Sequence, residues 1–295
     1  MKNGAISLAL AAALTLSTHS LATPARLEQS SWSNSKKFVQ LPNGIRMAYV
    51  ELGDPAGPPL VLLHGFTDSS RSWSLVASHL AKYRLLIPDQ RGHGDTTAPE
   101  CCYSSTQLAY DMLLFLDALA IEKAGIAGHS MGSMAAIAFA ADYPKRVSKV
   151  ALLGSTALPP VSRGNWLWSN IEGLTFPIDR NSSFVHQWAP QATAVDPQFA
   201  DAATSELLEI KPYVWRGVLR ELTDVPVGRH AADVRAPVLI LSGGRDPFFP
   251  AEHHQSLLKA FPSSKAYVYP EYGHNFLWDD PADVGRRLSV FFSAQ

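Results

Sequence analysis

Residues 123–132 read KAGIAGHSMG, and this stretch decides the fold of the chain. Its first half is an apolar run that predicts a buried strand, and Gly128 to Gly132 match the pattern G-x-S-x-G. A stretch rich in alanine and methionine, which predicts a helix, begins near Met131. On such a sharp turn the serine backbone is strained, and side chains in place of the two glycines would collide with the neighbouring strand and helix. We therefore expect the Oγ atom of Ser130 to stand clear of the sheet at the positive end of a helix, where developing negative charge is favoured.

A nucleophilic serine needs a base and a group that orients the base. The apolar run 237–241 predicts a strand that ends shortly before Asp246, and the strand predicted at 265–269 ends shortly before His274. The carboxyl ends of parallel strands share one edge of a sheet, so three residues far apart in sequence can meet there. The sequence thus predicts a catalytic triad of Ser130, Asp246 and His274, in a chain order that differs from both serine protease orders.

Each member of this triad also has a simpler interpretation. Ser130 could be a bystander in a tight turn, and Asp246, which precedes Pro247, could serve only as a turn former or helix N-cap. His274 is one of ten histidines, most of which are expected on the surface or in the core. The joint placement of the three residues favours the triad.

A fourth motif follows the strand predicted at 60–64, where Gly65 allows the backbone to turn inward. We expect the backbone N–H groups of Phe66 and Met131 to form an oxyanion hole. His64 is interpreted as a packing residue, because a second histidine base is not needed.

These motifs resemble the α/β-hydrolase fold superfamily, and most closely its small, capped, single-domain bacterial hydrolases. The segments that carry the resemblance are 64–66, 89–94, 128–132, 244–246 and 273–274. The resemblance implies that Ser130 is the nucleophile, His274 the base and Asp246 the acid, and that no metal or organic cofactor is required. Haloalkane dehalogenases and epoxide hydrolases of this fold carry an aspartate at the elbow, where this chain has Ser130. Other relatives place the acid after the sixth strand, but here residues 154–156 read GST and contain no carboxylate.

Around the motifs, strand and helix patterns alternate, which predicts an α/β fold with a mostly parallel central sheet and helices on both faces. A hairpin is expected first, with strands at 38–41 and 45–52. The further strands are expected at 60–64, 84–88, 123–128, 147–153, 237–241 and 265–269. Helices are expected near 72–81, 105–119, 131–143, 251–261 and 282–292.

Between residues 156 and 229 the alternation stops, and the segment carries four of the seven tryptophans. We expect a helical cap here, inserted after the sixth strand, with residues 23–155 and 230–295 forming the core. Most of these aromatic side chains are expected to pack the cap onto the core. Such a cap favours a pocket poor in water and an apolar or aromatic substrate.

Residues 1–22 are typical of a secretory signal, with Lys2, an apolar stretch at 5–16 and a small-x-small cleavage site at 20–22. A periplasmic or secreted protein is therefore expected, the alternative being a cytosolic protein with a disordered start. Residues 23–35 are polar and are expected to form a loop-like tether before the first strand. The formal net charge is −1, with no basic patch, so a small-molecule substrate is expected rather than nucleic acid or a membrane. The sequence leaves the oligomeric state open.

The two cysteines, Cys101 and Cys102, are adjacent. An exported protein permits a disulfide, but neighbouring cysteines bridge only through a distorted ring. A vicinal bridge, two free thiols and an intermolecular link are the alternatives, and we favour the vicinal bridge. No metal site is expected, since no Cys-x-x-Cys or paired histidine accompanies them.

The expected function is that of a serine hydrolase that cleaves an ester or lactone bond through an acyl-enzyme. Amide hydrolysis, carbon–carbon bond hydrolysis, perhydrolysis and acyl transfer would use the same triad, and the fold does not choose among them. A slow-turnover ligand-binding or sensor protein on the same scaffold is the alternative from another class.

Overall fold

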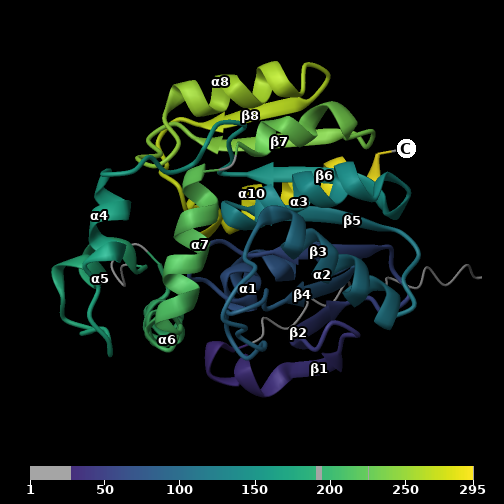
Figure 1. The fold of residues 1–295 in the computed structure, drawn as a ribbon. Coiled ribbons are helices and arrows are strands. Elements are labelled where there is room, and N and C mark those ends of the chain that lie inside the picture. The colour runs from purple at the N-terminus through teal and green to yellow at the C-terminus, as the bar shows by residue number, and fades with distance from the viewer. Residues whose placement is uncertain (1–27, 191–194, 225, 295) are drawn as a thin grey trace, which may run out of the picture.

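The computed structural model describes residues 28–190, 195–224 and 226–294, so the expected signal segment 1–22 lies outside the described residues (Figure 1). In the described part, eight strands form one sheet in the order β1-β2-β4-β3-β5-β6-β7-β8. Strands β3 to β8 run parallel, and the β1–β2 hairpin is attached antiparallel to β4. The predicted α/β fold class is confirmed. The strands are β1 Lys36–Gln40, β2 Arg46–Gly53, β3 Pro59–Leu63, β4 Arg84–Pro88, β5 Ala124–His129, β6 Val147–Leu153, β7 Val238–Gly243 and β8 Lys265–Tyr269.

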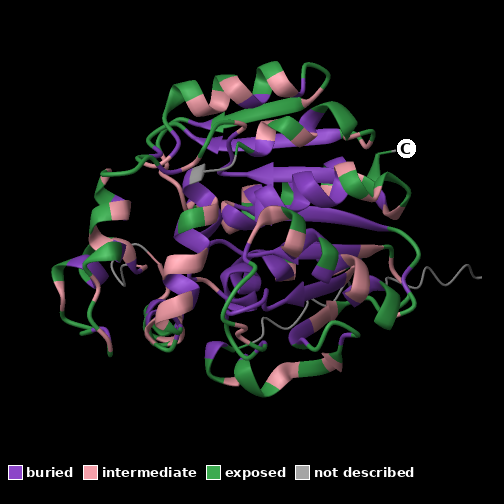
Figure 2. Cartoon of the chain, viewed as in Figure 1, coloured by how far each residue is buried: buried purple, intermediate pink, exposed green. Residues whose placement is uncertain are grey.

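Ten α-helices are described, and they cover both faces of the sheet. Because successive side chains of a strand point to opposite faces, each buried strand contributes side chains to the hydrophobic cores on both faces of the sheet. On β3, Val61 and Leu63 pack with α2 and α3, whereas Leu60 and Leu62 pack with α1 and α10. Figure 2 shows the central strands buried between helices whose outer surfaces are exposed. The helices are α1 Ser74–Ala77, α2 Ser105–Ala118, α3 Met131–Asp142, α4 Trp166–Glu172, α5 Ser183–Trp188, α6 Pro197–Leu208, α7 Pro212–Asp224, α8 Ala251–Ala260, α9 Phe276–Asp279 and α10 Pro281–Ser293.

The helix predicted at 72–81 is wrong as one continuous element. The segment is divided into a 3-10 helix at Ser70–Trp73, the single turn of α1 and a second 3-10 helix at Ser78–Leu80. Serine side chains compete with backbone groups for hydrogen bonds and so weaken a regular helix. Ser69, just before this segment, caps the first 3-10 helix by accepting from the Arg71 backbone N–H at 3.1 Å, and Ser74 of α1 accepts from Gln29 Nε2 at 2.8 Å.

The tether predicted before the first strand is also wrong for the part that is described. Residues 29–31 and 33–35 form two 3-10 helices, and Trp32 between them is fully buried. The Trp32 indole Nε1 donates to Ser70 Oγ at 3.1 Å. This segment is therefore part of the packed core, held by a tryptophan that anchors it to the loop after β3.

Helices α4 to α7 lie between β6 and β7, the place predicted for the cap. Figure 1 shows α4 and α5 to one side of the sheet, with α7 leading back toward it. We propose residues 156–229 as the extent of the cap. Across the residues that the structure describes, no helix has both the length and the apolar character needed to cross a bilayer.

The structure pairs Cys101 with Cys102 in a disulfide, the alternative that the sequence favours. The bridge lies in the loop between β4 and α2, where the Arg91 guanidinium donates to the Cys102 carbonyl at 2.8 Å. Arg91 is itself held by Asp111 of α2 through two hydrogen bonds, at 2.5 and 2.7 Å. The disulfide loop is thus fixed to the core.

Candidate active site

Ser130 lies at the turn between β5 and α3, with φ +50° and ψ −121°. Its backbone N–H donates to the Leu153 carbonyl of β6 at 2.9 Å, which fixes the turn against the sheet. A Cβ atom at Gly128 would clash with the Gly132 carbonyl, and one at Gly132 would clash with the Leu63 carbonyl of β3. The strained turn and the need for both glycines agree with the expectation from the sequence.

Asp246 and His274 meet at the same sheet edge, after β7 and β8 respectively. The His274 Nδ1 atom lies 2.7 Å from Asp246 Oδ2. The other carboxylate oxygen, Oδ1, accepts from the backbone N–H groups of Phe248 and Phe249, both at 2.9 Å. Burial alone would raise the pKa of Asp246, but the neighbouring His274 and these hydrogen bonds hold it below its usual value. Asp246 is therefore an ionised acceptor that fixes the orientation of the imidazole.

Ser130 and His274 line one cavity of about 460 Å³, together with Phe66. Asp246 is buried beside His274 and is not part of the lining. The structure thus brings four of the five predicted site residues together around the cavity, and Met131 follows Ser130 at the start of α3. The remaining lining is mostly apolar and consists of Met134, Pro160, Val161, Asn165, Trp166, Leu167, Gln187, Trp188, Leu222, Pro247, Phe248 and Phe249.

The predicted oxyanion donors are the backbone N–H groups of Phe66 and Met131. Among the described residues, neither N–H donates to a protein acceptor. The loop that carries Phe66 is held by His64, whose Nε2 accepts from the Gln90 backbone N–H at 2.8 Å. Burial lowers the pKa of His64 to about 3, so the ring is neutral and can act as this acceptor. This geometry agrees with the interpretation of His64 as a packing residue.

Aromatic side chains from the cap and the core meet above the cavity. Trp166, Phe184 and Trp188 of α4 and α5 stack on one another, with ring centroids 5.8 to 6.3 Å apart. Trp188 also contacts Phe248 edge to face, at 5.3 Å between centroids. Its indole Nε1 donates to Thr67 Oγ1 at 2.7 Å, directly after Phe66. The cap therefore contributes one wall of the cavity.

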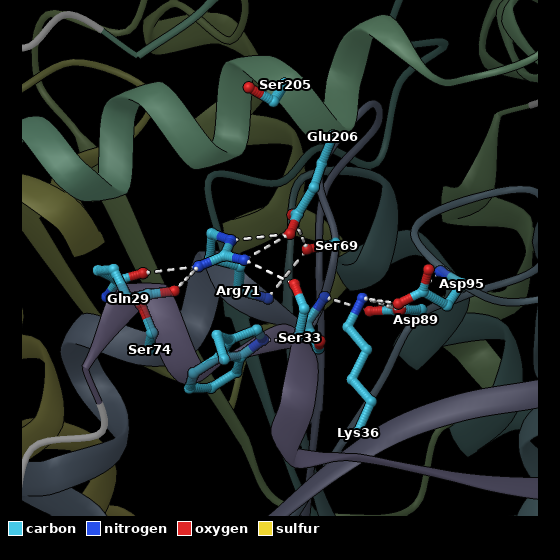
Figure 3. Close-up of polar contacts among 12 residues, drawn as sticks. Gln29, Ser33, Lys36, Ser69, Arg71, Ser74, Asp89, Asp95, Ser205 and Glu206 are labelled. Atoms are coloured by element: carbon cyan, nitrogen blue, oxygen red, sulfur yellow. Dashed lines mark hydrogen bonds and ion pairs between the residues drawn. The ribbon is translucent and has the colours of Figure 1, made fainter.

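A buried polar network fastens the cap to the core beside this site (Figure 3). Arg71, at the loop after β3, binds the Glu206 carboxylate of α6 through Nε at 2.8 Å and Nη2 at 2.7 Å. Arg71 also donates to the Gln29 carbonyl at 2.7 Å, and Ser69 donates to Glu206 at 2.5 Å. One guanidinium thus joins the N-terminal segment, the loop after β3 and the cap.

Two polar residues near Ser130 were not predicted from the sequence, Asp68 and His129. His129 is the first of the two variable residues of the G-x-S-x-G pattern, and Asp68 lies two positions beyond Phe66. Both line a second, smaller cavity next to Ser130. Their positions in the two motifs were the available signal, but only the folded chain shows that they approach each other.

Within the described ranges, no group of three or more His, Cys, Asp or Glu side chains is arranged to hold a metal ion. The three predicted triad residues supply a serine hydroxyl, an imidazole and a carboxylate, with backbone N–H groups beside them. This set can perform proton transfer and nucleophilic attack on a carbonyl carbon.

A family model described as the alpha/beta hydrolase fold matches residues 58–281. The chain is 29% identical over 274 residues to a putative 2-succinyl-6-hydroxy-2,4-cyclohexadiene-1-carboxylate synthase from Bacillus subtilis (strain 168), covering 87% of this chain and 98% of the relative. It is 26% identical over 290 residues to a 2-hydroxy-6-oxo-6-phenylhexa-2,4-dienoate hydrolase from Burkholderia cepacia, covering 91% and 99%. The crystal structure of a hydrolase from Pseudomonas aeruginosa PA01 has a TM-score of 0.77 at 22% identity, covering 88% of this chain and 98% of that one.

Proposed function

The chain belongs to the α/β hydrolase fold family, and from this premise we propose that it is a serine hydrolase that cleaves an ester or lactone bond of a small, largely apolar substrate. One observation carries the proposal. The imidazole of His274, oriented by Asp246 at 2.7 Å, faces the cavity that Ser130 also lines from its strained turn. A nucleophile, a base and an orienting acid are the parts that acyl transfer to serine requires.

In the proposed reaction, the Ser130 hydroxyl attacks the substrate carbonyl while the His274 Nε2 atom takes its proton. The oxyanion that forms would accept hydrogen bonds from the free N–H groups of Phe66 and Met131. Such donors typically contribute about 2.7–4 kcal/mol each to transition-state stabilisation. His274 then protonates the leaving group, and an acyl-enzyme on Ser130 remains. A water molecule activated by His274 hydrolyses it, while Asp246 keeps the imidazole in the required tautomer.

The lining of the cavity supports a neutral, apolar substrate. The Burkholderia cepacia and Bacillus subtilis relatives are named for substrates or products with a carboxylate, for which arginine is a frequent partner in proteins. No arginine or lysine is among the described residues that line the larger cavity here, and its polar groups besides Ser130 and His274 are the amides Asn165 and Gln187. An ester with an aromatic or aliphatic body fits this lining better than an anionic diketone-like substrate.

We propose a periplasmic or secreted location, on the sequence of residues 1–22 and on the disulfide, which is typical of oxidising compartments. The proposed partner is a small-molecule substrate, with neither nucleic acid nor a membrane involved. Detection of the mature chain in the periplasmic or culture fraction, with its N-terminus after residue 22, tests the location.

Labelling with a fluorophosphonate tests the nucleophile, and product analysis tests the reaction. We expect the protein to be labelled on Ser130 and to hydrolyse members of a panel of aryl esters, alkyl esters and lactones. The Ser130→Ala variant should be folded, unlabelled and inactive. An unlabelled wild-type protein would support a pure binding protein and refute the proposal. Turnover confined to amides or to carbon–carbon bonds would retain the triad and refute the ester assignment.

A further inference from the structure

A second, smaller cavity borders the reacting residues. A cavity of about 40 Å³ shares Phe66, Ser130, Trp188, Phe248 and His274 with the larger cavity of about 460 Å³. A volume of about 10–15 Å³ on this scale holds one water molecule, so the small cavity has room for roughly three non-hydrogen atoms. A substrate bound at Ser130 can therefore place its large part in the larger cavity and only a short group in the smaller one.

The small cavity differs from the large one in its polar groups. His129 is almost completely buried, and its Nε2 lies 3.1 Å from the His274 carbonyl oxygen. A carbonyl only accepts, so Nε2 carries the proton. Burial also lowers the pKa of His129 to about 3, which keeps the ring neutral. Nδ1 is then a lone-pair acceptor, and no described residue donates to it.

Asp68 lines the same small cavity as His129, whose Nδ1 is this unpaired nitrogen. A Cβ atom built on Gly65 would stand 2.9 Å from Asp68 Oδ2, 3.3 Å from His129 Nδ1 and 3.3 Å from Ser130 Cβ. The carboxyl oxygen and the ring nitrogen thus both lie close to the Gly65 backbone beside the nucleophile, and both residues line the small cavity. Burial raises the pKa of Asp68 to about 7, so at neutral pH its carboxyl is able to donate as well as to accept.

We propose that this small cavity is a hydroxyl-binding subsite, in which a hydroxyl on the short side of the substrate donates to His129 Nδ1 and hydrogen-bonds with Asp68. The inference rests on the proposed function and narrows its substrate class. The substrate is an ester or lactone with a bulky apolar part and a short part that carries a hydroxyl near the scissile carbonyl. The short part is either the acyl group or the alcohol group, since both flank the carbon that Ser130 attacks.

Matched substrates test this subsite, because a methyl group and a hydroxyl differ little in size. The acyl-side pair is 2-naphthyl propanoate and 2-naphthyl hydroxyacetate; the alcohol-side pair is the propyl and 2-hydroxyethyl esters of 2-naphthoic acid. We expect the wild-type kcat/KM to favour the hydroxylated member of one pair by about tenfold or more. The pair that shows the preference identifies the side of the ester that enters the small cavity.

Variants of Asp68 provide the control. Asp68→Leu should lower the ratio of kcat/KM between the hydroxylated and the hydroxyl-free member about tenfold, and Asp68→Asn should retain part of the preference. Equal rates on both members of both pairs in the wild type would overturn the subsite. Loss of activity on all substrates in Asp68→Leu would assign Asp68 a structural role and would also overturn it.

Binding to Ser130→Ala separates this inference from the proposed function, because no turnover is needed. N-2-naphthyl hydroxyacetamide and N-2-naphthyl propanamide form the acyl-side pair; the 2-hydroxyethyl and propyl amides of 2-naphthoic acid form the alcohol-side pair. Calorimetric titration should show about tenfold tighter binding of one hydroxylated amide, and this difference should vanish in Ser130→Ala with Asp68→Leu. Equal affinities within both pairs would overturn the subsite even if Ser130 proves to be the nucleophile. Conversely, a hydroxyl preference in binding without ester turnover would keep the subsite and refute the hydrolase.

Discussion

Lowering the pH from 7.0 to 5.5 is expected to destabilise the folded protein through three buried histidines, His64, His93 and His129. Each has one ring nitrogen placed to donate to a backbone carbonyl, at 2.8, 2.9 and 3.1 Å respectively. The other nitrogen faces no acceptor within hydrogen-bond distance among the described residues. In His64 it faces the Gln90 N–H, and in the other two it has no partner. A second ring proton therefore finds no acceptor, and burial lowers the pKa values to about 3, 4 and 3.

The sign and size of the effect follow from proton linkage. Below pH 6.5 the unfolded chain protonates these histidines while the folded protein does not, so the free energy of unfolding falls as the pH decreases. Between pH 7.0 and 5.5 the three histidines together lower the free energy of unfolding by about 4 kcal/mol. Asp68 acts in the opposite direction, because its raised pKa of about 7 lets the folded protein bind a proton, which restores about 2 kcal/mol. The expected net loss is about 2 kcal/mol.

Urea unfolding followed by tryptophan fluorescence at the two pH values, at constant ionic strength, measures this change. His93→Gln should reduce the pH dependence by about 1 kcal/mol, since one of the three groups no longer titrates. His79→Gln, the same replacement at an exposed position, is the control for the substitution itself. A wild-type protein that is equally stable or more stable at pH 5.5 would refute the reasoning.

Two further perturbations address the triad and the attachment of the cap. Asp246→Asn should lower kcat about 10⁴-fold, because an amide N–H opposite His274 Nδ1 selects the wrong tautomer of the imidazole. Circular dichroism of this variant should show an unchanged fold. A kcat within tenfold of wild type would assign the acid role to another residue. Arg71→Ala should destabilise the protein by about 3–5 kcal/mol in denaturant unfolding, because it leaves Glu206 half-buried without its cation. The matched control, Arg180→Ala, removes an exposed ion pair and should lower the free energy of unfolding by less than about 1 kcal/mol. Equal losses of stability in the two variants would contradict a stabilising role of the Arg71–Glu206 pair.

The sequence was most informative where local geometry dictates the structure. The turn at Ser130 could be predicted because only glycine fits at positions 128 and 132, and this requirement is visible in five consecutive residues. The buried strands could be predicted because a sheet covered on both faces needs continuous apolar runs, as in β5 and β7. The pairing of Asp246 with His274 followed from the shared edge of the parallel strands.

The errors and omissions lie where distant residues decide the structure. Trp32 looked like part of a polar tether because its hydrogen-bond partner, Ser70, is 38 positions away. The helix predicted at 72–81 is divided into short turns, and within it Ser74 accepts from Gln29, which lies 45 positions away. Asp68 and His129 are brought together because the loop after β3, which carries Gly65 and Asp68, packs against the end of β5, and no sequence spacing reveals this contact.

The cap and the reacting residues form one packed unit, and this has a consequence for substrate binding. Trp188 of the cap binds Thr67, the neighbour of Phe66, and packs on Phe248, whose backbone N–H holds Asp246. A ligand that displaces Trp188 therefore removes a contact from the loop that carries Phe66 and a contact from the loop that carries Asp246. Since Trp188 borders both cavities, a ligand that fills them while leaving this ring in place preserves both loops. Selection between substrates can thus operate through the geometry of the reacting groups as well as through the volume of the cavity.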